Sequence, residues 1–327
     1  MPGYSSFRRR LREWYESSRR PLPWRETEDP YLIWVSEIML QQTRVAAVLP
    51  YYGRFVKRFP DAGTLAQADE QEVLAMWSGL GYYRRARNLH RGARQIAAQG
   101  GFPSEYEAIR ALPGVGEYTA AAIASIAFGL PHAVVDGNVL RVMARLENDG
   151  GDVGSSAVRR RLGEEAARRL DRSAPGTFNQ AMMELGATIC LPRNPRCGEC
   201  PVAKFRKARL AGSQNQLPVK LRREVRAKVR EKILLIVRDG KVLMQRRGGS
   251  EGRLAGFWEL PGADLPGARI VSKLGEFRHA ITRHDYTVEV YSAKVKGTPP
   301  GYFWAALSTL CKFPVTSIAK KAMRWYQ

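Results

Sequence analysis

The sequence has few cysteines, and the ones it has are unevenly placed. Among its 327 residues there are four cysteines; Cys190, Cys197 and Cys200 lie close together, and Cys311 stands alone. A disulfide framework uses cysteines paired across a small secreted domain. This clustering excludes a disulfide-rich fold and favours metal ligation by the group of three.

Long apolar runs are also missing. A membrane-spanning helix needs about 18 consecutive apolar residues, and the longest candidate, Ala120 to Leu130, is too short and contains Ser125 and Gly129. The first residues are rich in arginine, are interrupted by Glu13 and Glu16, and lack the apolar core of an export signal. We therefore expect no membrane partner and a cytoplasmic location.

Acidic residues are scarce relative to basic ones. There are 31 Asp and Glu against 53 Lys and Arg, a net charge of +22 that is spread along the chain. Such a field attracts a polyanion. Ribosome-associated and membrane-surface proteins share this balance, so the charge favours nucleic acid without deciding the matter.

The chain divides into a helical part and a mixed part. From residue 7 to about 203, apolar positions recur every three or four residues, and short breaks rich in Gly or Pro occur at 59–61, 100–103 and 150–152. A basic, polar stretch follows and is typical of a linker. The predicted limits are a helical catalytic region over 1–205, a linker over 206–228 and a second domain over 229–327.

In the second domain the spacing of apolar residues is no longer that of helices. Residues 232–237 and 241–244 flank Asp239-Gly240, a pattern that predicts a β-hairpin. Residues 286–291 alternate like another strand, and 317–326 again have a helical pattern. The domain is therefore predicted to be α+β.

A glycine-rich turn lies between two helical stretches. Residues 112–116 read Leu-Pro-Gly-Val-Gly and lead into Tyr118. Two glycines around one apolar residue allow a tight turn with bare backbone N–H groups at a helix start, where a phosphate can dock. Taken alone, the pattern is equally typical of an ordinary corner between helices.

Asp136 follows some way downstream, directly before a predicted helix through Arg141 and Leu146. An Asp in this position is usually a plain N-cap. The turn, the apolar helix and Asp136 together resemble the helix-hairpin-helix plus Gly/Pro-Asp signature of a superfamily of DNA glycosylases. That combination is much more specific than any of its parts.

Three further motifs narrow the resemblance. Residues 22–25 read Leu-Pro-Trp-Arg, 34–43 read Trp-Val-Ser-Glu-Ile-Met-Leu-Gln-Gln-Thr, and 79–83 read Gly-Leu-Gly-Tyr-Tyr. They are similar, nearly residue for residue, to motifs of the MutY-type adenine DNA glycosylases, and the match covers most of residues 7–203. The resemblance implies a multidomain fold. An all-α helix-hairpin-helix glycosylase region, a six-helix barrel plus an iron-sulfur-loop domain, is followed by an α+β Nudix-like domain.

The family resemblance also implies a function. It is the excision of adenine mispaired with 8-oxoguanine or guanine in duplex DNA, in base excision repair, by a monomer in the bacterial cytoplasm at the nucleoid. The lyase branch of the superfamily carries a nucleophilic lysine just after the hairpin, where this chain has Tyr118. Because a phenol cannot form a Schiff base, we expect a monofunctional glycosylase.

Glu37 is the strongest catalytic candidate on its own chemistry. Ile33, Trp34, Ile38 and Met39 make its helix apolar on most sides. Burial without a cation raises the pKa of a carboxyl, which suits a general acid near neutral pH. The alternative is an ordinary solvated surface Glu.

The resemblance assigns a role to each remaining site residue. Glu37 protonates the adenine, Asp136 stays ionised and stabilises the sugar cation, and Tyr118 and Asn138 orient this pair. The DNA-binding residues are Arg25 at the flipped adenine, Gln42 and Tyr82 as wedges, and the backbone of Pro113, Gly114, Val115 and Gly116 at the phosphates. The alternatives are a salt bridge for Arg25, a surface amide for Gln42 and a core position for Tyr82.

The cysteine cluster is similar to the family's four-iron four-sulfur (4Fe-4S) loop, with one departure. Family members place a fourth cysteine six residues after the position of Cys200, where this chain has Arg206. Thiolate ligation of such a cluster normally uses four cysteines. The resemblance implies a 4Fe-4S cluster as cofactor, held by Cys190, Cys197 and Cys200 with one open iron. A bare loop and a zinc-bound loop are the alternatives.

The second domain resembles a Nudix fold without the metal-binding residues of a Nudix hydrolase. Residues 257–262 read Phe-Trp-Glu-Leu-Pro-Gly, yet 263–276 carry only Asp264 and Glu276 in place of a Glu-rich metal-binding run. In the family this domain recognises 8-oxoguanine through a loop before a strand. Two segments compete for that loop, 277–279 and 281–283; we prefer the second, with Thr282 and Arg283 as the contacts.

Two other functions remain as alternatives. One is a pyrimidine-damage or thymine-mismatch glycosylase of the same fold, against which Tyr118, residues 22–25 and the second domain count. The other is a DNA-damage binder without activity, against which the presence of both Glu37 and Asp136 counts.

Overall fold

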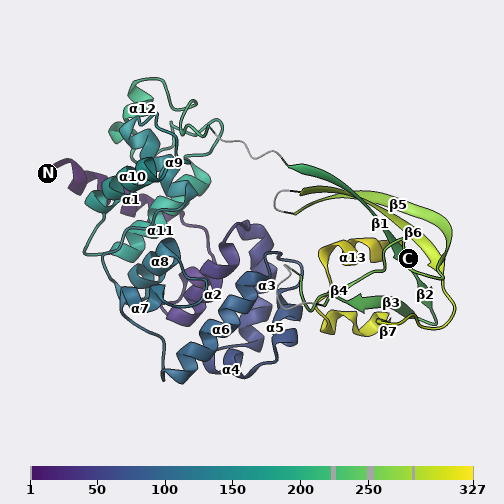
Figure 1. Ribbon diagram of the computed structural model, residues 1–327. Coiled ribbons are helices and arrows are strands. Elements are labelled where there is room, and N and C mark those ends of the chain that lie inside the picture. The colour runs from purple at the N-terminus through teal and green to yellow at the C-terminus, as the bar shows by residue number, and fades with distance from the viewer. Residues whose placement is uncertain (1, 222–225, 249–253, 282–283, 327) are drawn as a thin grey trace. The chain divides into compact units, whose positions relative to one another are not determined.

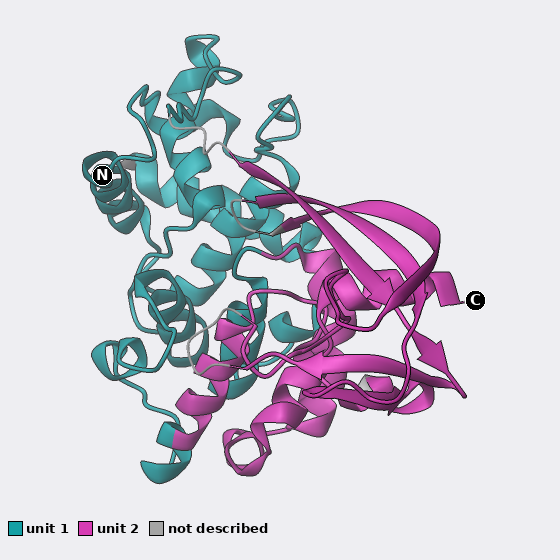
Figure 2. Cartoon of the chain, turned by 45° about the vertical axis from the view of Figure 1, so that its right-hand side comes forward, with its two compact units in different colours: residues 1–42, 95–223 teal, residues 43–94, 224–327 magenta. Residues whose placement is uncertain are grey.

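The computed structural model describes residues 2–221, 226–248, 254–281 and 284–326. The chain forms two compact units that interleave along the sequence (Figure 2). Unit 1 comprises Met1–Gln42 and Gln95–Arg223, and unit 2 comprises Thr43–Arg94 and Glu224–Gln327. The limits 1–205, 206–228 and 229–327 follow chain order instead, and they stay a prediction.

Unit 1 is helical (Figure 1). Its α-helices are α1 (Pro2–Ser18), α2 (Pro30–Leu40), α7 (Tyr106–Arg110), α8 (Glu117–Phe128), α9 (Gly137–Glu147), α10 (Ser156–Arg169), α11 (Pro175–Thr188) and α12 (Lys207–Leu210). Two 3-10 turns, η1 (Pro23–Arg25) and η2 (Ala203–Phe205), connect them. Helix α6 (Arg84–Ala98) begins in unit 2 and ends in unit 1.

The ends of the helices that carry the site are set by short polar residues. The Asp29 carboxylate accepts the Tyr31 N–H at the start of α2, and Pro30 occupies the first helical position, where no N–H is needed. The Asp136 carboxylate accepts the Val139 N–H at the start of α9. Helix α9 ends at Glu147, and its C-cap Asn148 takes the left-handed conformation with φ of 57°.

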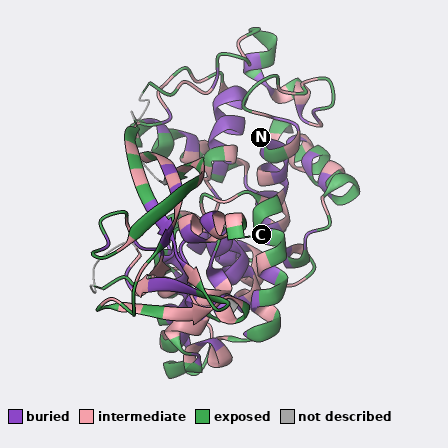
Figure 3. Cartoon of the chain, turned by 90° about the vertical axis from the view of Figure 1, so that its right-hand side faces the viewer, coloured by how far each residue is buried: buried purple, intermediate pink, exposed green. Residues whose placement is uncertain are grey.

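The main core of unit 1 joins four helices. Leu11 of α1, Val142 of α9, Leu162 of α10 and Leu185 of α11 belong to one cluster of buried apolar side chains. Cys190, Cys200 and Val202 belong to the same cluster, so the cysteine loop is packed into the core. Figure 3 colours each residue by its burial, and buried, intermediate and exposed residues alternate along the helices and strands.

Unit 2 combines helices with two sheets. Its other helices are α3 (Val45–Arg58), α4 (Ala62–Gln67), α5 (Glu70–Trp77) and α13 (Ser317–Ala322), with 3-10 turns η3 (Leu307–Lys312) and η4 (Met323–Tyr326). Its strands are β1 (Ala227–Leu235), β2 (Val237–Arg238), β3 (Lys241–Arg246), β4 (Trp258–Glu259), β5 (Arg269–Ile281), β6 (His284–Lys294) and β7 (Tyr302–Ala306). The strand expected at 286–291 and the helical tail at 317–326 are confirmed.

Strand pairing divides these strands into a three-stranded and a four-stranded sheet. In the first, β1 pairs parallel with β6 and β6 pairs antiparallel with β5. In the second, β3 pairs antiparallel with β2, β4 and β7. Successive residues of β1 face opposite sides: Ile233 and Leu235 join one apolar cluster, and Leu234 joins another.

The β-hairpin expected around Asp239-Gly240 is confirmed in part. Asp239 and Gly240 have φ of 50° and 69°, as a type I′ turn requires, and β2 pairs with β3 across them. Residues 232–235 do not join this hairpin, because they belong to β1 and pair with β6. The run read as one strand is therefore two, which separate at Ile236 and enter different sheets.

The breaks expected in the helical half separate α3 from α4, α6 from α7 and α9 from α10. Residues 206–221, part of the expected linker, belong to unit 1 and are partly buried within it. Leu217 is 5% exposed, and Val219 forms a bridge with Asp152. No helix in the described part of the chain is long and apolar enough to cross a membrane.

Candidate active site

Glu37 lies on α2 inside unit 1, with 5% of its surface exposed. The Tyr118 hydroxyl, on α8, donates a hydrogen bond of 2.6 Å to its Oε2. Burial and, to a smaller extent, the nearby Asp136 raise the pKa of Glu37, the Tyr118 hydrogen bond and the Arg25 charge oppose the shift, and the resulting pKa is about 7. The raised pKa expected from the apolar helix is therefore found, and a large fraction of Glu37 is protonated at neutral pH.

Asp136 precedes α9 and has two fixed hydrogen bonds. Its Oδ1 accepts the Val139 N–H at 2.6 Å, and its Oδ2 accepts the Asn138 amide at 2.8 Å. Burial raises the pKa of Asp136, and these two bonds act in the opposite direction. Asn138 is held in turn by Arg141, which donates to its Oδ1 at 2.8 Å. The carboxylate is thus an N-cap and an oriented group at once.

A glycine on α11 makes room for this arrangement. A Cβ placed on Gly186 would lie 2.7 Å from the Asn138 Cβ and 3.1 Å from the Asn138 carbonyl oxygen. Arg141 also donates to the Gly186 carbonyl at 2.8 Å. Helices α9 and α11 therefore meet backbone to backbone beside the residues that flank Asp136.

Arg25 lies in a buried ion pair. Its guanidinium donates to Glu184 Oε2 at 2.7 Å and to the Arg20 carbonyl at 3.1 Å. Glu184 on α11 is fully buried and also accepts two hydrogen bonds from the Arg20 guanidinium, at 2.7 and 2.6 Å. Burial alone would raise the pKa of Glu184, but the hydrogen bonds from Arg20 and Arg25 outweigh it and lower the pKa to about 2.

Sequence reasoning did not find Glu184. The signal that pointed to Glu37, a lone acidic residue in an apolar helix, is also present at Glu184 between Met182, Met183 and Leu185. What the sequence does not contain is the partner, because Arg25 lies 159 positions away in the chain.

The two wedge candidates have the same unusual backbone. Gln42 and Tyr82 are exposed and have φ of 55° and 49°, in the left-handed region. Non-glycine residues rarely adopt this region, and such strain gathers at functional sites. Tyr82 is 43% exposed, so it is not a core residue.

Within unit 2, Arg85 lies behind Tyr82. Its guanidinium lies 5.2 Å from the centre of the Tyr82 ring and 5.4 Å from that of Trp77, and it donates to Thr43 Oγ1 at 3.1 Å. Burial lowers the pKa of Arg85 to about 10. Arg85 could not be found from the sequence, because its place depends on stacking between side chains.

The glycine-rich turn joins α7 to α8. Gly114 has φ of 79°, and Val115 is buried, so its backbone and not its side chain is available to a ligand. Gly116 is the N-cap of α8, in extended backbone, and a Cβ placed on it would meet nothing within 4 Å. The fold therefore needs a glycine at 114 but not at 116, where the missing side chain leaves the helix start open.

The cysteines of the loop lie around the side chain of Arg206. Cys190, Cys197 and Cys200 are free thiols, and Arg206 donates to Cys190 Sγ at 3.0 Å and to Cys197 Sγ at 3.6 Å. Arg206 is 1% exposed. Four thiolates normally hold an iron-sulfur cluster, and here a cation takes the place of the fourth. The side chains in this loop do not fit that cluster.

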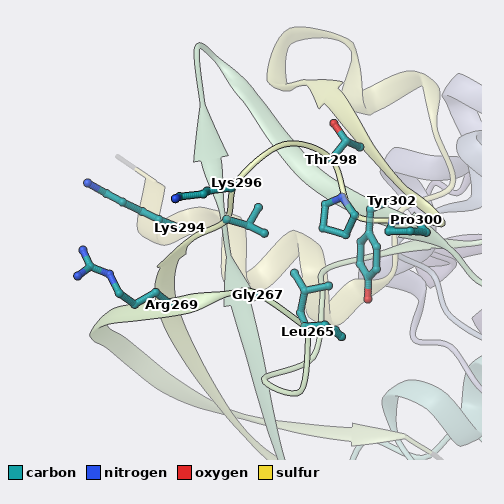
Figure 4. A pocket seen from close by; sticks show the side chains of 11 residues that line it. Leu265, Gly267, Arg269, Lys294, Lys296, Thr298, Pro300 and Tyr302 are labelled. Atoms are coloured by element: carbon teal, nitrogen blue, oxygen red, sulfur yellow. The ribbon is translucent and has the colours of Figure 1, made fainter.

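Thr282 and Arg283, the predicted lesion contacts, lie outside the described residues. Unit 2 has a cavity of about 1020 Å³, lined by Leu265 and Tyr302 and by the basic residues Arg269, Lys294 and Lys296 (Figure 4). None of the described candidate residues lines it, and no acid lies on its wall. Glu37 and Asp136 are in unit 1, where a second cavity of about 740 Å³ borders Tyr118, Val135, Arg159 and Arg160.

Comparison with known proteins gives matches over nearly the whole chain. Residues 35–168 match the HhH-GPD superfamily base excision DNA repair protein, and 190–205 match the iron-sulfur binding domain of endonuclease III. The chain is 34% identical to the adenine DNA glycosylase of Mus musculus, over 99% of this chain and 78% of that protein. It is 34% identical to the Homo sapiens adenine DNA glycosylase, over 99% of this chain and 74% of that protein.

Solved structures match the helical part. A thermostable thymine-DNA glycosylase is 31% identical with a TM-score of 0.55, over 62% of this chain and 95% of that chain. A non-covalent endonuclease III–DNA complex is 20% identical with a TM-score of 0.53, over 65% of this chain and 97% of that chain, and shows the fold alone. With the strands of unit 2, the matches confirm the expected fold class, a helix-hairpin-helix region followed by an α+β domain.

Proposed function

This chain belongs to the adenine DNA glycosylase family, and from that premise we propose that it hydrolyses the N-glycosidic bond of adenine paired with 8-oxoguanine or guanine in duplex DNA, as a step of base excision repair. One observation carries the proposal. Glu37 is a buried carboxyl with a pKa of about 7, held by the Tyr118 hydroxyl.

Glu37 is the general acid of the proposed reaction. Adenine is a poor leaving group, so its departure requires a proton on the base. A carboxyl with a pKa near the working pH is protonated often enough to act and acidic enough to release the proton. The Tyr118 hydrogen bond stabilises the carboxylate that remains and fixes the orientation of the acid.

Asp136 is the ionised partner. Cleavage leaves an oxocarbenium-like sugar, which a nearby carboxylate stabilises. The hydrogen bonds from Val139 and Asn138 favour the ionised form of Asp136. The two carboxyls thus have different environments, the arrangement that separates an acid from a stabilising anion. Asp136 also orients the attacking water or forms a transient covalent intermediate.

The reaction is monofunctional. Tyr118 follows the hairpin at the position where the lyase branch has its lysine, and a phenol forms no Schiff base with the abasic sugar. The product is an abasic site in an intact strand.

Duplex DNA is bound by the backbone of the glycine-rich turn, by two wedge side chains and by the positive charge of the chain. The backbone of Pro113, Gly114, Val115 and Gly116 receives phosphates at the start of α8. Gln42 and Tyr82 enter the duplex while the adenine is flipped out of the stack, at a cost of a few kcal/mol. The net charge of +22 supports this partner.

Arg25 acts at the flipped adenine indirectly. Its ion pair with Glu184 fixes it near Glu37, whose pKa its charge lowers. We assign it to holding the base pocket in shape. The salt bridge and the role in base recognition are therefore compatible, because the same ion pair positions the guanidinium.

The α+β domain is Nudix-like and recognises 8-oxoguanine, with Thr282 and Arg283 as the contacts. The chain acts as a monomer on nucleoid DNA in a bacterial cytoplasm. A bacterial relative, the adenine DNA glycosylase of Buchnera aphidicola subsp. Baizongia pistaciae, is 39% identical over 65% of this chain and 61% of that protein, which supports the setting. No step of the reaction passes through an iron-sulfur cluster.

The test is single-turnover cleavage of three duplexes, containing adenine opposite 8-oxoguanine, adenine opposite guanine, or thymine glycol, each with and without alkali afterwards. We expect cuts at adenine only after alkali, and fastest opposite 8-oxoguanine. Glu37→Gln should lose the activity, and Glu28→Gln, which removes the same charge at an exposed position, should keep it.

A second candidate is thymine-mismatch or pyrimidine-damage excision, which the 31% identical thymine-DNA glycosylase structure favours. A thymine opposite guanine is added as a fourth duplex to cover it. Excision at the pyrimidine and not at adenine would reject the adenine reaction, and cutting without alkali would reject the monofunctional one. Binding of all the duplexes without any product would make the chain a DNA-damage binder.

A further inference from the structure

Arg206 lies at the centre of the cysteine loop of unit 1. Its guanidinium is 1% exposed and donates to the sulfurs of Cys190 and Cys197 at 3.0 and 3.6 Å. The Cys200 sulfur also interacts with it. A buried cation is stable only where acceptors replace its hydration, and at Arg206 the acceptors are the sulfurs that would otherwise face a metal.

A second buried arginine ties the same loop to α9. Arg145, with no exposed surface, donates to Cys190 Sγ at 3.3 Å, to the Leu191 carbonyl at 2.7 Å and to the Leu217 carbonyl at 2.9 Å. From the next turn of α9, Arg141 donates to the Cys190 carbonyl at 2.7 Å. These bonds fix both the backbone and the sulfur of Cys190 without a metal.

The loop is also closed by apolar packing. Cys190, Cys200 and Val202 are buried in the cluster that contains Val142 and Leu185. Among the described residues, no group of three or more His, Cys, Asp or Glu is arranged to hold a metal ion. The match to the iron-sulfur binding domain spans 190–205 and ends one residue before Arg206.

We propose that Arg206 replaces the iron-sulfur cluster of this loop, so that a guanidinium surrounded by three cysteine sulfurs is its structural centre and the chain folds without iron. The replacement is specific in its chemistry. A guanidinium is planar and has five N–H donors, so it reaches several sulfurs at once. A positive group in this position also repels the iron ions that four thiolates would attract.

The first measurement is the metal content of the full-length protein. It is expressed in iron-rich medium, purified without oxygen, and then incubated with excess ferrous iron and sulfide before desalting. Iron and acid-labile sulfide are counted per chain. We expect neither in stoichiometric amount, before or after incubation. A stoichiometric cluster in either sample would overturn the proposal.

A matched pair of variants tests the position itself. Arg206→Cys supplies a fourth thiol inside the loop, and Lys204→Cys makes the same change of charge and thiol at an exposed position two residues earlier. We expect Arg206→Cys alone to take up iron and sulfide and turn brown. Two results would reject Arg206 as the occupant of a cluster site. One is equal uptake of iron and sulfide by both variants, and the other is no uptake by either variant although both are folded.

A third measurement uses the wild-type protein, so it holds even if Arg206→Cys fails to fold. We expect its melting temperature to be the same with and without a strong iron chelator. Arg206→Met, which keeps the length but loses the donors, should lower it by about 5 °C or more. A chelator-sensitive wild type, or an Arg206→Met protein as stable as wild type, would contradict the proposal. None of these readouts depends on the excision reaction.

Discussion

Tyr118 donates a hydrogen bond of 2.6 Å to Glu37 and thereby links α8 to α2 inside unit 1. The bond stabilises the ionised form of a carboxyl whose burial favours the protonated form. Glu37 is held between these two effects with a pKa of about 7. A small change in either effect therefore moves the fraction of protonated acid at physiological pH.

The excision rate should follow the protonation of Glu37. With a pKa of about 7, the acid is lost as the pH rises, so the single-turnover rate should be level below pH 7 and fall about tenfold per pH unit well above it. The rate of adenine release, measured from pH 5 to 9 with enzyme in excess, checks this. A rate that is independent of pH over that range would remove Glu37 from the role of acid.

The same pKa predicts an effect on stability. Below pH 4.5 the carboxyl is protonated in both folded and unfolded chains, so it contributes no difference. Between pH 4.5 and about 7 only the folded chain keeps the proton, so the free energy of unfolding falls as the pH rises. Above pH 7 the loss reaches about 3 kcal/mol.

Glu37→Gln removes that loss, because an amide does not ionise and still accepts the Tyr118 hydrogen bond. The variant should be inactive, and at pH 8 it should unfold at a higher denaturant concentration than wild type. At pH 4 the two should unfold alike. Urea unfolding at both pH values measures this, with Glu28→Gln as the control; equal stability of Glu37→Gln and wild type at pH 8 would show that Glu37 ionises freely.

Tyr118→Phe should separate positioning from acid strength. Without its donor the carboxylate of Glu37 is less stable, so the pKa rises above 7 and the fall in rate moves to higher pH. The matched control is Tyr106→Phe, because the Tyr106 ring stacks on His132. The pH–rate profiles of the two variants are compared with wild type. A lower rate with an unshifted profile would reduce Tyr118 to a packing role.

Parts of the site could be predicted because their causes are local. Residues that surround Glu37 in one helix determine its burial, and the Asp-Gly pair determines the turn at 239–240. The pairing of β1 with β6 could not be predicted, since the two strands are far apart in the chain and nothing in residues 232–235 selects a distant partner over the nearby hairpin. The Glu184–Arg25 ion pair is hidden for the same reason.

Arg206 shows the limit in another form. The sequence reveals that an arginine replaces the fourth cysteine, but the arginine side chain could equally have pointed to solvent. Only the structure shows it buried against Cys190 and Cys197. A departure from a motif thus shows where a site has changed. The effect of the change depends on where the new side chain lies in the structure.

The contact between Gly186 and Asn138 predicts a loss of both stability and activity. An added methyl on Gly186 would lie 2.7 Å from the Asn138 Cβ, so α9 and α11 must separate, at a cost of about 1–3 kcal/mol. Asn138 holds Asp136, so the excision rate should fall as well. Gly163→Ala is the control, because its methyl meets Val135 at an ordinary 3.6 Å. Thermal unfolding and single-turnover rates of both variants test this; a Gly186→Ala protein equal to Gly163→Ala would contradict it.

The glycine-rich turn at 112–116 contains two glycines whose substitution should affect different properties, stability at one and DNA binding at the other. Gly114 has φ of 79°, so Gly114→Ala should lower the free energy of unfolding by about 1 kcal/mol. Gly116 is extended and has free space around it, so Gly116→Ala should change stability by less than about 0.5 kcal/mol. Its methyl nevertheless covers the start of α8, where a phosphate is expected, so binding to duplex DNA should weaken.

Fluorescence anisotropy with a labelled undamaged duplex at two salt concentrations, together with urea unfolding, separates these effects. Gly101→Ala is the control, since a Cβ there also meets nothing within 4 Å and Gly101 lies outside the turn. If Gly116→Ala binds DNA as tightly as Gly101→Ala does, the phosphates do not approach the backbone at Gly116, and the turn is only a corner between two helices. Weaker binding by a variant of unchanged stability has no cause within the fold and requires a ligand at that backbone.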